Sequence, residues 1–81
     1  MKLFRISQDI HNGWDTYSDA VVVAPNEVVA KNIHPDSYKG CDPWPRDIWA
    51  DTPDQVEAEY IGEAAEHLSQ GAVICASFHA G

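Results

Sequence analysis

The sequence predicts a single α+β domain: a mostly antiparallel sheet of about four strands packed on one main helix, in the order β-β-α-β-β. Three observations favour this class. Four segments show the composition or the alternation of strands, one segment shows the spacing of an amphipathic helix, and most of the links are short. The 81 residues allow one small globular domain, residues 1–81, and the apolar fraction of 44% argues against disorder.

The first two expected strands lie in the N-terminal part of the chain. Apolar and polar residues alternate from Lys2 to Asp9, which is the pattern of a half-buried strand. Residues 11–19 are polar and include an Asn-Gly turn dipeptide, so we expect a loop or a hairpin connection there. Residues 20–24 form a continuous run of alanine and valine, which is typical of a central strand buried on both faces.

A helix is expected to begin at Pro25, because proline suits the first turn and Glu27 complements the positive end of the helix dipole. Val29 and Ile33 are spaced i,i+4, so they would lie on one face of this helix. Pro35 should end the helix, since the residue before a proline is disfavoured in the helical conformation. These limits predict a helix of about nine or ten residues.

The stretch from Asp36 to Pro53 is irregular and rich in proline, and a loop of this length in a small domain is often functional. Residues 48–50 are apolar enough to add a brief strand, and for the same reason we expect Trp49 to lie in the core. Trp44 stands between two prolines and is the better candidate for an exposed ring.

Two more strands are expected in the C-terminal part. Residues 55–61 alternate clearly, so their apolar and acidic side chains should face opposite sides of the sheet. Residues 62–70 allow one short helix that Gly71 would close. Residues 72–80 form the last expected strand, which completes the order of elements given above.

Neither an enzyme nor a metal site is expected. Cys75, Ser77 and His79 share one face of the last strand, but i,i+2 neighbours stand about 6.5–7 Å apart, too far for a nucleophile to reach its base. The histidines and cysteines lack the clustered spacing of structural zinc sites. No phosphate-binding glycine motif occurs. The sequence therefore predicts no catalytic residues, no metal and no cofactor.

Charge is the strongest compositional signal. The formal net charge of −8 disfavours direct binding to nucleic acid or to an anionic membrane. Residues 1–46 contain six acids and five bases, whereas residues 47–81 contain seven acids and no lysine or arginine. Carboxylates spaced about 6.5–7 Å along a strand resemble the phosphates of one DNA strand, so this segment suits a partner's nucleic-acid groove. An acidic surface that only keeps the chain soluble is the alternative.

The residues predicted to bind such a partner combine these acids with the exposed ring. They are Asp47, Asp51, Asp54, Glu57, Glu59, Glu63 and Trp44.

The chain is expected in the cytoplasm. Residues 1–10 lack the apolar run of a signal peptide, and the longest apolar run, residues 20–25, is too short to span a bilayer. Cys41 and Cys75 are therefore expected to be reduced thiols. The small core makes a homodimer one way of gaining stability.

A nucleotide-binding function stays open as an alternative. The first loop, with Trp14, Asp15, Thr16 and Tyr17, would form the ligand pocket together with the start of the helix. The few lysines and arginines count against this reading, because a phosphate bound to a chain of net charge −8 needs local positive compensation.

Three segments together carry a resemblance: residues 2–9 (Lys-Leu-Phe-Arg-Ile-Ser-Gln-Asp), residues 14–22, and residues 74–81 (Ile-Cys-Ala-Ser-Phe-His-Ala-Gly). The chain resembles a group of small, uncharacterised acidic proteins encoded in bacteriophage and prophage genomes, over most of its length and including residues 60–64. Such proteins often inhibit restriction, CRISPR or other defences, and some sequester nucleotide signals. The resemblance implies a phage-encoded accessory protein that binds and inhibits a host defence protein in the bacterial cytoplasm, with a nucleotide-signal sponge as the alternative.

Overall fold

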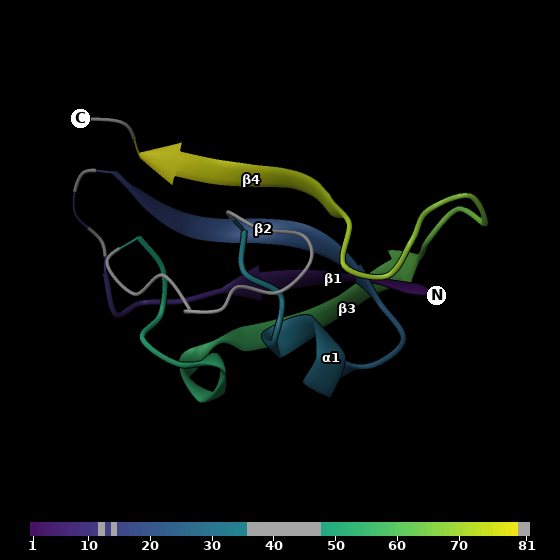
Figure 1. The fold of residues 1–81 in the computed structure, drawn as a ribbon, viewed down its shortest axis with the longest axis horizontal. Helices are drawn as coiled ribbons and strands as arrows, with labels where there is room; N and C mark the ends of the chain where they lie inside the picture. The colour runs from purple at the N-terminus through teal and green to yellow at the C-terminus, as the bar shows by residue number, and fades with distance from the viewer. Residues whose placement is uncertain (12, 14, 36–47, 80–81) are drawn as a thin grey trace.

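The computed structural model describes residues 1–11, 13, 15–35 and 48–79, which form a four-stranded antiparallel sheet and one short α-helix (Figure 1). The elements are β1 (Lys2–Ser7), β2 (Thr16–Ala24), α1 (Glu27–Lys31), the 3₁₀ helix η1 (Pro53–Gln55), β3 (Glu57–Glu63) and β4 (Val73–His79). The strand order in the sheet is β3-β1-β2-β4, so β1 and β2 are interior and β3 and β4 are the edges. The chain therefore has the mixed α+β class, mostly sheet, that its sequence predicts.

The main core cluster lies on one side of the sheet, and Val23 of β2 is buried on the other side. Phe4 and Ile6 of β1 and Ala20 and Val22 of β2 are buried in the main core cluster, and α1 packs on the same side as that cluster against β1, β2 and β3. The segment that precedes η1 adds to this cover, because Trp49 has no exposed surface. The expected core position of Trp49 is confirmed. Among the described residues 48–50, however, no strand is formed, so that expectation is wrong.

The helix is shorter than its sequence predicts. Asn26 caps its start, with the side-chain oxygen accepting a hydrogen bond from the backbone N–H of Val29 at 2.9 Å. Asn32 ends it, because its side-chain amide donates to the carbonyl of Val28 at 2.8 Å and its backbone N–H donates to the carbonyl of Val29. The prediction of nine or ten residues ending at Pro35 is therefore wrong: local capping stops α1 at Lys31.

The second strand is longer than its sequence predicts. β2 begins at Thr16, inside the segment expected to be a loop. Two long-range contacts hold this polar segment in the sheet: the backbone N–H of Tyr17 donates to the carbonyl of Ile48 at 2.8 Å, and its ring packs on Phe78 of β4, with ring centroids 4.7 Å apart. These contacts come from residues more than 30 positions away, so local composition could not reveal them.

The prediction of a short helix at residues 62–70 is wrong. β3 continues through Glu63 because Gly62 and Glu63 pair with Leu3 and Lys2 of β1. Turns then lead to β4, and Gly71 takes a positive φ of 89°, a conformation that favours glycine. Its N–H donates to the carbonyl of Val23 at 2.8 Å, which fixes the entry into β4.

Because Trp49 is fully buried against the sheet, Trp49→Ala should lower the free energy of unfolding by about 3–5 kcal/mol. Urea denaturation followed by circular dichroism would measure the loss. Val28→Ala is the control: Val28 lies in α1 with 71% of its surface exposed, and its truncation should change the stability by less than about 0.5 kcal/mol. Equal losses in the two variants would contradict a core centred on Trp49.

Candidate functional site

The face of the sheet opposite α1 carries most of the polar side chains of the strands, and we call its polar part the open face. Its membership follows from the register, because residues paired across antiparallel strands share a face. Arg5 of β1 stands between Val21 of β2 and Glu59 of β3, and Ser7 stands between Asp19 and Glu57. Cys75 and Ser77 of β4 continue the face, paired with Val21 and Asp19. The open face is made of Arg5, Ser7, Asp19, Val21, Glu57, Glu59, Cys75 and Ser77.

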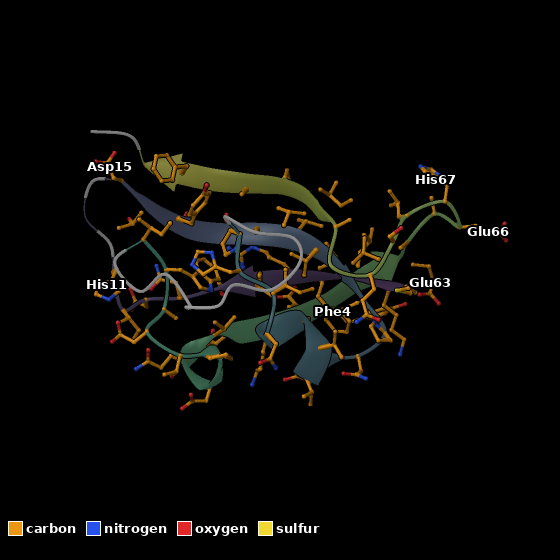
Figure 2. All side chains as sticks on the ribbon, viewed as in Figure 1. Phe4, His11, Asp15, Glu63, Glu66 and His67 are labelled. Atoms are coloured by element: carbon orange, nitrogen blue, oxygen red, sulfur yellow. The ribbon has the colours of Figure 1, made fainter. Side chains whose placement is uncertain are left out.

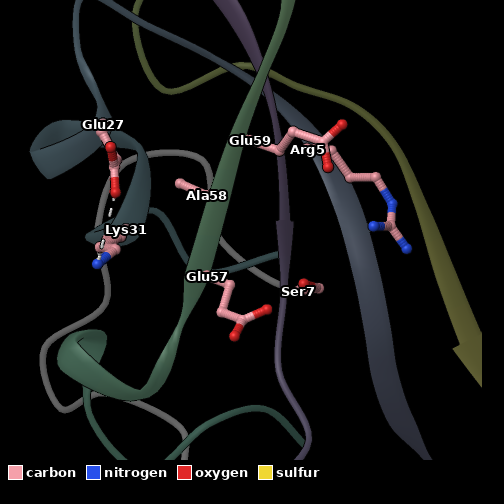
Figure 3. Close-up of a pocket in the computed structure, with 7 residues that line it drawn as sticks. All are labelled: Arg5, Ser7, Glu27, Lys31, Glu57, Ala58 and Glu59. Carbon is pink, nitrogen blue, oxygen red and sulfur yellow. Dashed lines mark ion pairs between the residues drawn. The ribbon is translucent and has the colours of Figure 1, made fainter.

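An ion pair occupies the centre of the open face. The guanidinium of Arg5 contacts the Asp19 carboxylate at 2.8 Å, although Arg5 is directly opposite Glu59 in the register. Arg5 thus turns toward β2 and away from β3, as Figure 3 shows. Neither Glu57 nor Glu59 makes an ion pair with a described residue, and both are exposed. The open face therefore presents two carboxylates on β3 that no described cation compensates.

Two hollows border this face. One, of about 340 Å³, lies around β3 and is lined by Arg5, Ser7, Glu27, Lys31, Glu57, Ala58 and Glu59 (Figure 3). In it Lys31 is paired with Glu27 of its own helix at 3.7 Å. The other hollow, of about 270 Å³, lies between β2 and β4 and is lined by Arg5, Asp19, Ala20, Val21, Cys75, Ala76 and Ser77.

A β-bulge separates Glu63 from Glu57 and Glu59. The register shifts between Leu3 and Phe4, which leaves Ile61 as an extra residue in β3. Simple alternation would place residues 57, 59 and 63 on one face. The bulge instead pairs Glu63 with Lys2, which lies on the same face of β1 as the buried Phe4. Glu63 consequently lies away from the open face.

The other described acidic residues of the predicted binding set lie away from the open face. Asp51 is paired with His11 at 2.8 Å, and Figure 2 shows His11 at the end of the molecule opposite Glu63 and Glu66. Asp54 lies in η1 and lines a further hollow with residues of α1. A hydrogen bond from the side chain of Thr52 lowers the pKa of the Asp54 carboxyl below its ordinary value of 3.8. The structure therefore brings together only Glu57 and Glu59 of the predicted binding residues; Asp47 and Trp44 lie outside the described residues.

The residues predicted for nucleotide binding have contacts within the fold. Thr16 is buried and its hydroxyl donates to the carbonyl of Gly13 at 2.7 Å, while Tyr17 packs on Phe78. Asp15 has a positive φ of 59°, as turn residues often do. Trp14 lies outside the described residues. Thr16 and Tyr17 therefore contact other parts of the fold and help to hold the start of β2 in place.

The structure gives the last strand the face that its alternation predicts, since Cys75 and Ser77 line one hollow. Cys75 is an exposed free thiol. The side chain of His79 and the whole of Cys41 lie outside the described residues. Within the described part of the chain, no group of three or more histidine, cysteine or acidic side chains is placed to hold a metal ion. Nor does any described helix have the length and hydrophobicity to cross a membrane.

Gln8 organises the loop before β2, although it is not among the residues predicted for a site. Its amide donates to the carbonyls of His11 and Tyr17, and its side-chain oxygen accepts from the backbone N–H groups of Ile10 and His11, all at 2.7–2.9 Å. Only 8% of the Gln8 surface is exposed, and its buried amide group makes four hydrogen bonds with backbone groups of the loop. The sequence signal that could have indicated this role is the position of a polar, hydrogen-bonding residue at the end of an alternating strand.

Comparison of the chain with protein-family models, with curated proteins and with solved structures returned no match.

The hydrogen bond from Thr52 predicts a measurable titration effect. Thr52→Val should raise the pKa of the Asp54 carboxyl toward 3.8, because the hydroxyl that stabilises the ionised form is lost. Since the folded pKa is the lower one, this contact stabilises the fold above the unfolded pKa, and its contribution is lost as the pH falls through the folded value. NMR titration of the Asp54 carboxyl carbon would measure the change. Thr52→Ser keeps the hydroxyl and should keep the pKa low; a raised pKa in both variants would rule out this cause.

Proposed function

We propose that the chain is a small accessory protein that binds a host protein and inhibits it, with the open face docking on a basic, nucleic-acid-binding groove. One observation supports this proposal above the others: Glu57 and Glu59 are exposed on the same face of β3 without an ion-pair partner among the described residues. Their i,i+2 spacing of about 6.6 Å is close to two axial phosphate steps of about 3.4 Å along one DNA strand.

The position of Arg5 keeps this pair of carboxylates available. Directly opposite Glu59, its guanidinium would be the natural internal partner of that carboxylate. Asp19 holds the guanidinium at 2.8 Å on the other side, so Glu59 can pair with a cation of another molecule. The overall charge of −8 would add long-range attraction to a basic groove and speed association.

The inhibitory role and the phage context rest on the resemblance described above and on the charge. A groove that binds nucleic acid through arginine and lysine is blocked by any ligand that occupies the same cations. Such a ligand needs no catalytic group and no cofactor, which agrees with the sequence expectation that the chain is not an enzyme.

A charge-reversal pair tests the proposal. The partner would first be recovered from host lysate by pull-down at low salt, and its affinity then measured with purified protein. The double variant Glu57→Lys and Glu59→Lys should weaken binding at least tenfold, because two carboxylates on the contact surface become cations. The affinity of the unmodified chain should also fall steeply between low and high salt.

The matched control is the double variant Glu63→Lys and Glu66→Lys. It changes the net charge by the same amount, but Glu63 lies off the open face and Glu66 lies in the turn that follows β3. It should lose much less affinity. Equal losses in the two double variants, or an affinity that salt does not change, would contradict docking through the open face.

A further inference from the structure

Arg5 is the one basic residue of the open face, and three carboxylates of the sheet surround it. The register places Arg5 directly opposite Glu59 of β3, a position at which Cβ atoms lie about 4.5–5.5 Å apart. Glu57 of β3 and Asp19 of β2 stand on either side of the neighbouring Ser7, so both are diagonal neighbours of Arg5. A long side chain reaches diagonal positions as well as the position directly across. The guanidinium can therefore pair with an acid on either side of β1.

In the structure the guanidinium lies on the β2 side. It contacts the Asp19 carboxylate at 2.8 Å, and Figure 3 shows the Arg5 side chain turned toward β2. The Asp19 side chain is 28% exposed, whereas Glu57 and Glu59 are exposed residues of an edge strand. An ion pair is stronger where less water surrounds it, and the shorter aspartate loses less side-chain freedom on pairing than a glutamate does. These differences explain why Arg5 pairs with Asp19.

The other side of β1 has room for the same guanidinium. Arg5 lines the hollow of about 270 Å³ together with Asp19, and it also lines the hollow of about 340 Å³ together with Glu59. None of the residues that line the larger hollow is buried. A turn of the Arg5 side chain toward Glu59 would therefore displace no core residue, so the contact with Asp19 is what keeps Arg5 on the β2 side.

The direction of this one side chain sets where negative charge stands on the open face. With Arg5 paired to Asp19, the β2 side carries no net charge, and both Glu57 and Glu59 are left without a described cation. With Arg5 paired to Glu59 instead, β3 would keep one such carboxylate, and the other would be Asp19 on β2. The total charge would be the same in both cases, but the two adjacent carboxylates on one strand exist only in the first.

We propose that Asp19 is a positioning residue for the docking surface: it holds Arg5 on the β2 side and so keeps Glu57 and Glu59 available to a basic partner. The inference rests on the proposed function for the role of the two glutamates, and it adds a residue of β2 that acts through Arg5 and not by touching the partner. Removal of the Asp19 carboxylate should let Arg5 pair with Glu59 and should weaken docking, although no residue of β3 is changed.

The first test uses the full chain without a partner. In Asp19→Asn, the guanidinium protons of Arg5 should give nuclear Overhauser effects to the side-chain protons of Glu59 that the unmodified chain lacks. Glu66→Gln is the matched control, because it removes one negative charge from the turn after β3 and should leave Arg5 at Asp19. Circular dichroism would check that both variants fold. An Arg5 guanidinium that stays away from Glu59 in Asp19→Asn would overturn the proposal.

The second test measures affinity for the partner recovered by pull-down. Asp19→Asn should weaken binding about three- to tenfold, and Glu66→Gln should weaken it much less. The double variant Arg5→Gln and Asp19→Asn should restore the affinity to within about twofold, because Glu57 and Glu59 again have no cation beside them. Its net charge is also the original −8, since one base and one acid are removed together. A double variant as weak as Asp19→Asn would mean that Asp19 touches the partner or only supports the fold, and would overturn the proposal.

The positioning role and the proposed function fail in different ways. If Glu57→Lys with Glu59→Lys leaves the affinity unchanged, docking through the open face is wrong, and the role of Asp19 in docking is wrong with it, even where Arg5 moves in Asp19→Asn. If that charge reversal weakens binding but the removal of Arg5 does not rescue Asp19→Asn, docking through the open face stands and the positioning role alone is wrong.

Discussion

The described structure depends on one constraint: a chain of 81 residues buries its main core cluster on one side of its sheet. α1 and the segment around Trp49 cover the side that carries Phe4 and Ile6. A chain of this size buries a smaller fraction of its surface than a larger domain does. The polar part of the opposite face is consequently formed by the strands themselves, and the charges on that face follow from which residues of each strand point away from the core.

The β-bulges decide which of those residues share a face. In β3 the extra residue, Ile61, shifts the alternation, so Glu63 leaves the face of Glu57 and Glu59. In the pairing of β2 with β4 two further irregularities adjust the strands, between Tyr17 and Asp19 and between Val21 and Val22. A single inserted residue therefore reduces a continuous acidic strand to one pair of carboxylates. Because Arg5 is paired with Asp19, it does not neutralise Glu57 or Glu59, and no other described cation does so.

The two edge strands of the sheet differ in charge. The open face around β3 is acidic, and an interaction there would depend on opposite charge and on salt. The edge strand β4 contains no aspartate, glutamate, lysine or arginine.

Local patterns in the sequence were sufficient to predict that the four strands exist, the core position of Trp49 and the concentration of acids after residue 46, although they also predicted a strand at residues 48–50 that does not form. Alternation and apolar runs report burial directly, and charge is a matter of composition. Tertiary structure alone decided that β2 extends back to Thr16 and that Glu57 and Glu59 are separated from Glu63. These features depend on strand register and on contacts such as Tyr17 with Ile48, which join residues far apart in the chain. Periodicity within one segment contains no information about the register of its partner, so the sequence could indicate an acidic segment but not which of its carboxylates share a surface.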